Sequence, residues 1–312
     1  MTTATAAVDT RTASWPVWST TATVVVERPE ALAAACALVE ADLAAVDAAA
    51  SRFRPDSALA AVNAAAGRWV SIPALLAELV AVALEAAELT GGAVDPSLGA
   101  ALRDAGYDRD ISLAGRGPQT GPRVSVRYRG PRWREVELAG DRIRIPRGTE
   151  LDLGATAKAW TADHAAAAAL AATGCPVLVD LGGDLAVAGC GERTPFPVVL
   201  AEDHRSRTGP VVYVGDGGLA TSTTTARTWV LDGQLRHHLI DPATGLPAQG
   251  PWQTATAAAG TCVAANTAAT AAIVLGRQAL DWLREAGLPA RLVGTDGSIS
   301  TINGWPADPG TP

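Results

Sequence analysis

Aromatic residues and cysteines are scarce in this chain, and both shortages exclude classes of function. Only 4% of the residues are aromatic, so few rings are available to stack on a flat ligand. The four cysteines form no CxxC pair and none lies at zinc-ligand spacing from a histidine. The sequence therefore predicts reduced, mostly buried thiols in a reducing compartment, without a disulfide framework or a zinc centre.

Long apolar runs and an apolar leader are also missing. The longest run, residues 165–172, is far shorter than the roughly 20 residues that a helix needs to cross a bilayer. The N-terminal segment has no apolar core and no cysteine at a cleavage site. We therefore expect no membrane span and a cytoplasmic location.

Positive charge is in deficit. The 25 basic residues face 32 acidic ones, which gives a net charge of −7. Nucleic acid binding needs a basic face, so nucleic acid is not the expected partner. A hydrophobic content of 48% with 18% charged residues is typical of a globular protein.

Four common enzyme signatures are absent. The chain contains no GxxxxGK[ST] phosphate loop and no GxGxxG at the start of a βαβ unit, so the common nucleotide folds are not indicated. It also contains no HExxH and no GxSxG, so zinc protease and α/β-hydrolase functions are not indicated. Any nucleotide or metal chemistry must come from other patterns.

Pairs of strands joined by short turns, with helices inserted between them, dominate the expected secondary structure. Strands are expected at 18–27, 133–138, 142–146, 176–181, 185–189, 196–201, 210–214, 217–222, 228–232 and 254–261, with a last hairpin around 296–297. Helices are expected at 31–53, 57–63, 73–89, 155–173, 263–276 and 277–286. This order predicts an α+β fold, with mainly antiparallel sheets flanked by helices. One domain is expected over residues 15–305, between a disordered N-terminus (1–14) and a C-terminal tail (306–312).

The stretch 151–173 is the element around which the chain is organised. A strand end turns at Gly154 and enters an alanine-rich helix, with Lys158 in its first turn. A lysine is unfavourable there because the helix N-terminus is already positive. A bound anion would make it favourable, since free N–H groups after Gly154 would bind the same anion. Asp152 supplies an acceptor or a counter-charge. The stretch indicates an anionic ligand such as phosphate; the alternative is a surface lysine at an ordinary helix start.

A polar pair interrupts an apolar helix near the C-terminus. Asn266 and Thr270 are four residues apart and share one face, which is otherwise alanine and valine. They are either two oxygen ligands for a hard cation, with Mg²⁺ favoured, or an Asn266 cap and a Thr270 bonded to its own helix. The sequence leaves both interpretations open.

Other candidate groups lie in strands and turns. His237 and His238 precede Asp241, and in an extended strand their side chains point to opposite faces, so only one faces a site. Asp95 and Asp184 lie in the glycine-rich loops GGAVDP and DLGGD, where the simplest function of an aspartate is to stabilise its turn.

Taken together, these patterns resemble the ApbE family of FAD:protein FMN transferases, from about residue 18 to about residue 302. Seven motifs in the family's order carry the resemblance: SRFRPDSALAAVN (51–63), TGGAVDPSLG (90–99), LDLGATAKAWTAD (151–163), LVDLGGD (178–184), LATS (219–222), HLIDPATGLP (238–247) and CVAANTAAT (262–270). The resemblance implies an ApbE-like domain over 15–305 that binds FAD and Mg²⁺. It also implies transfer of FMN, through a phosphoester, to a threonine of a target flavoprotein with release of AMP.

The resemblance also implies a set of site residues. The metal would be held by the main-chain carbonyl of Ala155 and by Asn266 and Thr270. The residues against the flavin nucleotide would be Trp18, Phe53, Ala93, Val94, Asp95, Asp152, Lys158, Gly183, Asp184 and Ile240. Lys158 would meet an FAD phosphate, and the rings of Trp18 and Phe53 suit stacking. His238 and Asp241 are the candidate bases for the threonine proton.

One position departs from the family's pattern. The family's metal-binding helix reads Asp-x-x-x-Thr, whereas this chain has Asn266. The amide oxygen still coordinates Mg²⁺ but brings no charge, so we expect a weak metal site that fills together with FAD, with Asp184 or Asp241 compensating in charge. Two other functions stay open: a Mg²⁺-dependent FAD pyrophosphatase that yields FMN and AMP, and a flavin-binding protein without catalysis.

Overall fold

An eight-stranded sheet is the largest element of the fold. The computed structural model describes residues 10–107, 130–193, 195–200 and 208–306. The strand order is β1-β2-β6-β7-β10-β15-β16-β17, and every neighbouring pair is antiparallel. The strands are β1 (Arg11–Val17), β2 (Thr20–Val26), β6 (Val177–Leu181), β7 (Asp184–Ala188), β10 (Gly217–Thr223), β15 (Trp252–Ala259), β16 (Ala290–Gly294) and β17 (Ile299–Ile302). The prediction of mainly antiparallel sheets with flanking helices is confirmed.

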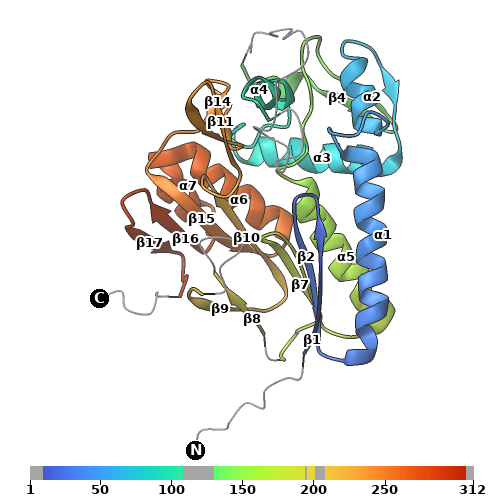
Figure 1. Ribbon diagram of the computed structural model, residues 1–312, viewed down its shortest axis with the longest axis vertical. Helices are drawn as coiled ribbons and strands as arrows, with labels where there is room; N and C mark the ends of the chain where they lie inside the picture. The colour runs from blue at the N-terminus through green and yellow to red at the C-terminus, as the bar shows by residue number, and fades with distance from the viewer. Residues whose placement is uncertain (1–9, 108–129, 194, 201–207, 307–312) are drawn as a thin grey trace, which may run out of the picture.

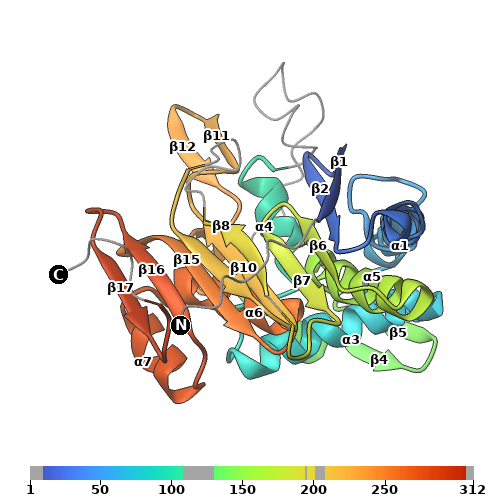
Figure 2. The ribbon, with the colours of Figure 1, turned by 90° about the horizontal axis from the view of Figure 1, so that it is seen from below.

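Four helices cover one face of this sheet (Figures 1 and 2). Helices α1 (Leu32–Ala50) and α5 (Ala157–Thr173) pack together over β2, β6 and β7, while α6 (Cys262–Leu275) and α7 (Ala279–Glu285) pack over the strands from β10 to β17. Alanines such as Ala35, Ala162 and Ala166 fill the contact between helices and sheet. Small side chains let these layers approach closely, which explains how an alanine-rich chain builds a core.

The opposite face of the sheet is covered by a separate hairpin of β8 (Phe196–Val199) and β9 (Val211–Val214). Its side chains Phe196 and Val212 pack on Leu178, Val187 and Leu219 of the sheet. The centre of the sheet is therefore buried on both faces, and β6 is apolar at nearly every position rather than at alternate ones.

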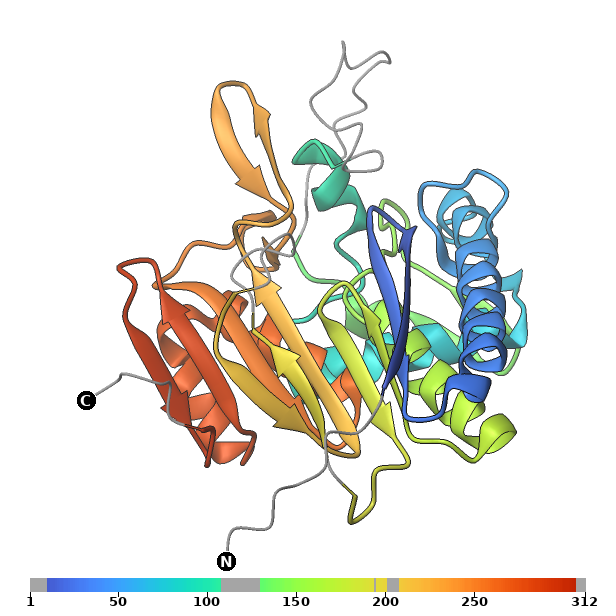
Figure 3. The same ribbon diagram turned by 60° about the horizontal axis from the view of Figure 1, so that its bottom comes forward.

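A second apolar cluster supports the start of α5. It gathers the end of α1, α2 (Ala58–Ala64), α3 (Ala74–Leu89) and a small sheet of β3 (Val70–Ser71), β5 (Arg142–Arg144) and β4 (Glu137–Ala139). Leu151 and Leu153, which lead into α5, are buried in this cluster. The remaining elements are α4 (Gly99–Asp104), β11 (Thr228–Leu231), β12 (Gln234–His237), β13 (Ile240–Asp241), β14 (Leu246–Pro247) and the 3₁₀ turns Pro29–Ala31, Trp133–Glu135 and Gly276–Gln278. The β11–β12 hairpin projects from the body of the molecule (Figures 2 and 3).

The N-terminal hairpin corrects two predictions. The strand expected at 18–27 is β2, and it is preceded by β1, which begins at Arg11 inside the segment expected to be disordered. Trp18 and Ser19 form the two-residue turn, with φ of 46° and 58°. A turn with two positive φ values normally carries Asn or Gly. The Trp-Ser pair gives no such signal, so the hairpin was missed.

Other expectations concern cysteines and membranes. All four cysteines are free, with Cys175, Cys190 and Cys262 buried and Cys36 half-buried, as predicted. Within the described ranges, no helix is both long enough and apolar enough to cross a bilayer. Residues 1–9 and 307–312 lie outside the described residues.

Ser57 caps α2, and its replacement is expected to lower stability. Its Oγ accepts a hydrogen bond from the N–H of Ala60 (3.0 Å) and donates one to the carbonyl of Ser51 (2.6 Å), and the residue is only 2% exposed. We expect Ser57→Ala to lower the free energy of unfolding by about 1–2 kcal/mol. Urea unfolding measures this, with Ser57→Thr as the control that keeps the cap. Equal midpoints for Ser57→Ala and the wild type would contradict the prediction.

Candidate functional site

A cavity of about 1080 Å³ opens where the β6–β7 turn, the end of β10 and the start of α5 meet. Small-molecule sites commonly measure roughly 300–1000 Å³, so this cavity has room for a dinucleotide. It is lined by all but one of the predicted site residues: Trp18, Phe53, Ala93, Val94, Asp95, Asp152, Ala155, Lys158, Gly183, Asp184, His238, Ile240, Asn266 and Thr270. Residues that lie far apart in sequence are therefore brought together as predicted.

Asp241 is the exception. It does not line the cavity. Its Oδ1 accepts from the N–H of Ala243 (2.8 Å) and its Oδ2 from the hydroxyl of Thr244 (3.2 Å). Because neighbouring strand residues alternate in direction, Ile240 faces the cavity and Asp241 faces its own turn. The Asp241 side chain therefore bonds to the turn that follows β13 and not to the cavity, against the prediction that it serves as a base or compensates charge at the metal.

The strand–helix junction before α5 is held by side chains from other elements. The amide of Asn63 binds both backbone groups of Leu151, with distances of 3.0 and 2.8 Å. Asp152 forms an ion pair with Arg52 and accepts the N–H of Gly154 at 2.8 Å. These contacts fix the direction in which α5 enters the cavity.

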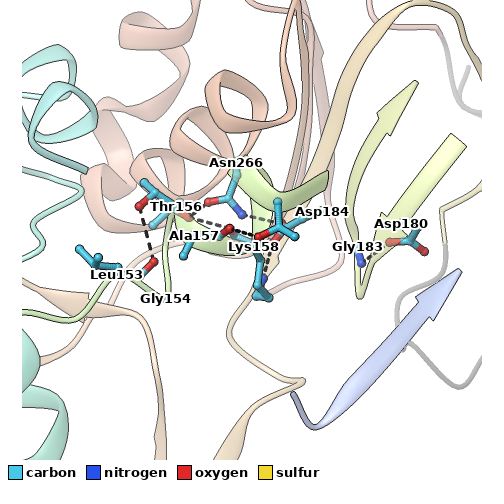
Figure 4. Close-up of polar contacts among 12 residues, drawn as sticks. Leu153, Gly154, Thr156, Ala157, Lys158, Asp180, Gly183, Asp184 and Asn266 are labelled. Atoms are coloured by element: carbon cyan, nitrogen blue, oxygen red, sulfur yellow. Dashed lines mark hydrogen bonds and ion pairs between the residues drawn. The ribbon is translucent and has the colours of Figure 1, made fainter. Parts of the chain in front are cut away.

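Three backbone N–H groups of this junction already have acceptors. The N–H of Gly154 binds Asp152, and those of Thr156 and Ala157 bind the carbonyl of Leu153 at 3.1 and 2.8 Å (Figure 4). Two of the N–H groups after Gly154, those of Thr156 and Ala157, are therefore not free to bind an anion. The Lys158 side chain, in the first turn of α5, also lines the cavity and brings a positive charge to it.

The β6–β7 turn presents Asp184 beside Lys158. Gly182 and Gly183 have φ of 68° and 92°, which favour glycine. A Cβ on Gly182 would lie 2.0 Å from the hydroxyl of Thr20, so the turn packs too closely for any side chain. The N–H of Gly183 binds Asp180 at 2.8 Å (Figure 4). Burial, more than any other cause, raises the pKa of Asp180 to about 6.

Lys158, Asp184 and Asn266 converge in the cavity (Figure 4). The Lys158 ammonium pairs with Oδ2 of Asp184, and Nδ2 of Asn266 donates to Oδ1 of Asp184 at 2.5 Å. Asn266 accepts the hydroxyl of Thr270 at 3.3 Å, and Thr270 lies 3.0 Å from the Ser222 hydroxyl. We call these five residues the polar cluster. Asp184 is its one negative charge.

The open question about Asn266 and Thr270 is settled in part by these contacts. The cap of α6 is Thr261, whose hydroxyl accepts the N–H of Ala264 at 3.1 Å, so Asn266 is not a cap. Both residues are buried and bond to side chains of the polar cluster. Both residues line the cavity, so ligation of a cation by their oxygens stays a hypothesis.

The donor set fits a hard cation. The main-chain carbonyl of Ala155, the amide oxygen of Asn266, the hydroxyl of Thr270 and the carboxylate of Asp184 all belong to residues that line the cavity, and Mg²⁺ prefers oxygen ligands. Within the described ranges, no group of three or more His, Cys, Asp or Glu side chains gathers as a metal centre. A cation here would depend on neutral oxygens and few carboxylates.

An aromatic wall forms another side of the cavity. The rings of Phe53 and Tyr107, which line the cavity, lie 5.6 Å apart edge to face. Behind them Trp229 is buried and does not line the cavity, and it stacks on Tyr107 at 5.3 Å. The guanidinium of Arg52 lies 4.2 Å from the Phe53 ring centre and 4.5 Å from that of Tyr107. Sequence reasoning found Phe53 but missed the other three. Arg52 adjoins Phe53 in the first motif, whereas nothing in the sequence singles out Tyr107.

Asp95 and Arg52 each bring to the cavity a polar atom that has no protein partner. Oδ1 of Asp95 accepts from the N–H and hydroxyl of Ser97, both at 2.6 Å, but its buried Oδ2 has no hydrogen bond. Nη2 of Arg52 is likewise buried without one. Burial raises the pKa of Asp95. Because unpartnered buried polar atoms are costly, both are suited to bind a polar ligand.

Of the two adjacent histidines, one faces the cavity, as predicted. His238 lines it, and its Nδ1 is buried without a partner. Burial and the positive charges of Arg227 and Lys158 hold the pKa of His238 well below its usual range. His237 does not line the cavity and bonds through Nε2 to the carbonyl of Ala248 at 3.0 Å. The lowered pKa favours the neutral form of the His238 imidazole.

Asp163 connects helices α5 and α6. Sequence reasoning did not identify this structural role. From α5, its carboxylate accepts the N–H groups of Cys262 (2.7 Å) and Val263 (2.9 Å) at the start of α6. It satisfies two N–H groups that the first turn of a helix leaves free. This contact fixes Lys158 on one helix relative to Asn266 on the other.

Comparisons with known proteins identify similar sequences. The ApbE family model matches residues 18–292. The FAD:protein FMN transferase of Treponema pallidum (strain Nichols) is 34% identical over 215 residues, which are 62% of this chain and 58% of that protein. The protein of the same name from Escherichia coli (strain K12) is 30% identical over 151 residues, 47% of this chain and 43% of that protein. The chain thus matches about half the length of these relatives.

Solved structures show the same fold. The ApbE protein of Thermotoga maritima superposes with a TM-score of 0.81 at 23% identity, covering 94% of this chain and 97% of that one. The apo flavinyl transferase ApbE of Pseudomonas stutzeri gives a TM-score of 0.78 at 23% identity, with 94% and 95% covered. The arrangement of sheet and helices is therefore one that these proteins share.

Proposed function

The chain belongs to the ApbE family, and on that premise we propose that it is a Mg²⁺-dependent FAD:protein FMN transferase. The acceptor would be a threonine of a target flavoprotein. Its hydroxyl oxygen forms a bond to the phosphorus on the FMN side of FAD, the pyrophosphate P–O bond breaks, and AMP leaves. One observation carries the proposal: a single cavity brings together a cation for phosphate, a set of oxygen ligands, a neutral histidine and an aromatic wall.

Each part of the cavity has a task in this reaction. Lys158 binds a phosphate of FAD, because a charge-assisted contact there neutralises the anion. Phe53 offers an exposed ring to a flat base or flavin ring. Ala155, Asn266, Thr270 and Asp184 would hold Mg²⁺, which neutralises charge on the transferring phosphoryl group when bound.

His238 accepts the proton of the acceptor hydroxyl. Its neutral imidazole lines the cavity, and Nδ1 has no competing partner. Threonine and water enter such a site by the same route, so hydrolysis of FAD to FMN and AMP is the competing reaction. Product analysis without an acceptor separates the two: FMN and AMP accumulate only if water is used.

Removing Lys158 tests the phosphate contact. We expect Lys158→Ala to weaken FAD binding by about 1.5–3 kcal/mol, roughly 10- to 150-fold in Kd, because a charge-assisted hydrogen bond to phosphate is lost. Titration of flavin fluorescence in EDTA measures the Kd. Free FMN and AMP serve as reference ligands, since each retains part of the contact. Unchanged FAD affinity would contradict the assignment of Lys158.

A further inference from the structure

Asp184 is the most constrained charge in the cavity. It is 2% exposed, and each of its oxygens has one partner within the polar cluster. Oδ2 pairs with the ammonium of Lys158, whereas Oδ1 takes a neutral N–H of Asn266. The cluster as it stands is electrically neutral, with one positive and one negative group.

A divalent cation in this cluster needs Asp184. The oxygens of Asn266 and Thr270 are neutral, and desolvating a divalent ion among neutral ligands is costly. Asp184 is bonded directly to the Asn266 amide, so its carboxylate adjoins these oxygens. The position on α6 that lacks a carboxylate is therefore next to a strand residue that has one.

The ammonium of Lys158 already forms an ion pair with the Asp184 carboxylate. An ammonium bound to Oδ2 repels a divalent ion approaching the same group, because like charges repel strongly at such distances in a partly buried site. Lys158 is also the only lysine of the chain, and its side chain is 15% exposed. Unlike the planar fork of an arginine, a lysine is a point charge on a flexible stem, which suits an exchange of partners.

We propose that Asp184 is the charged ligand of the cation site and that Lys158 blocks it until a phosphate anion draws Lys158 away. The phosphate then takes the ammonium, and the freed carboxylate takes the divalent cation. Binding of the anion and of the cation thus assist each other to the same extent, as linkage requires. The inference rests on the proposed function for the source of the phosphate, but its test needs neither flavin nor acceptor.

The test measures Mn²⁺ binding to the purified chain by electron paramagnetic resonance of the free ion, without nucleotide. Wild type should bind Mn²⁺ weakly. Lys158→Met should bind at least about tenfold more tightly, about 1.4 kcal/mol, because the blocking charge is gone. The double variant Lys158→Met with Asp184→Asn should lose this gain. No gain in Lys158→Met, or a gain that survives in the double variant, would overturn the proposal.

Arg227→Met is the matched control, because Arg227 lines the same cavity but makes no described contact with Asp184. It should change Mn²⁺ affinity much less than Lys158→Met; an equal gain would mean that general charge, and not the ion pair, governs the site. Should Lys158→Met fail to fold, as judged by circular dichroism, Lys158→Gln takes its place.

The unique lysine gives a second readout in the wild type. Protein labelled with ¹³C-lysine has one side-chain signal, that of Lys158. Inorganic pyrophosphate alone should shift this signal, and Mg²⁺ alone should leave it nearly unchanged. If Mg²⁺ alone shifted the signal as far as pyrophosphate does, the proposal that Lys158 keeps the cation from Asp184 would be contradicted. No flavin is present in these experiments. A negative result would therefore not contradict the transferase proposal, and a failure to transfer FMN would not contradict the proposed exchange at Asp184.

Discussion

Replacement of His238 by glutamine is expected to lower the rate of flavin transfer by about 10²- to 10⁴-fold, the usual contribution of a general base. Glutamine keeps a similar size and polarity but cannot take up the proton. Burial and the charges of Arg227 and Lys158 keep the imidazole neutral, and its Nδ1 has no other partner. Single-turnover measurement of AMP release with saturating FAD gives the rate of the chemical step directly.

The adjacent histidine supplies the control. His237 bonds to Ala248 outside the cavity, so His237→Gln should transfer at close to the wild-type rate.

The pKa of His238 also sets the direction of the pH dependence of transfer. Because the pKa of His238 is lowered, its imidazole becomes protonated only in acid. The transfer rate should therefore stay level through neutral pH and should decrease only at pH values below the pKa of an ordinary histidine. A His238→Gln variant with full activity would exclude His238 as the base.

Asn266→Asp should make the stability of the protein depend on metal. The new carboxylate would replace the N–H that now binds Asp184 at 2.5 Å and place two carboxylates side by side. One must take up a proton or remain an uncompensated buried charge, which costs about 3–5 kcal/mol. We expect urea unfolding in EDTA at pH 7 to show a loss of this size, and Mg²⁺ to restore most of it.

The charge swap is the control for that experiment. Asn266→Asp combined with Asp184→Asn keeps one carboxylate and one amide and exchanges only their positions. We expect this double variant to unfold in EDTA close to the wild type, because the amide–carboxylate hydrogen bond re-forms. If Asn266→Asp alone were as stable as the wild type without metal, the described contact between residues 184 and 266 would be wrong.

The sequence predicted the site better than it predicted the contacts within it. Lys158 and Asn266 stand out because each departs from its local pattern: a cation at a helix start and an amide on an apolar face. Asp184 is named because it ends the motif LVDLGGD. That Asp184 joins the other two depends on sheet order and on Asp163, which fixes α5 against α6. Such long-range pairing has no local signature.

The misses have the same origin. Tyr107 completes the aromatic wall, and Trp229 supports it from more than a hundred residues further along the sequence. Neither residue lies in a recognisable motif. The first strand was missed because its turn uses Trp18 and Ser19 at positive φ. Asp241 was predicted to act at the site because a carboxylate follows the two histidines, without knowledge of where its side chain points. The alternation of side chains along the strand directs it away from the cavity.

The central claim is transfer of FMN to a protein hydroxyl. The most direct test is intact-mass spectrometry of a flavoprotein domain bearing the acceptor threonine, after incubation with this protein, FAD and Mg²⁺. We expect the acceptor to gain the mass of FMN minus water, AMP to appear in equal amount, and the gain to vanish when the acceptor threonine is replaced by valine. Intact FAD with an unmodified acceptor, or FMN and AMP released without attachment, would contradict the claim.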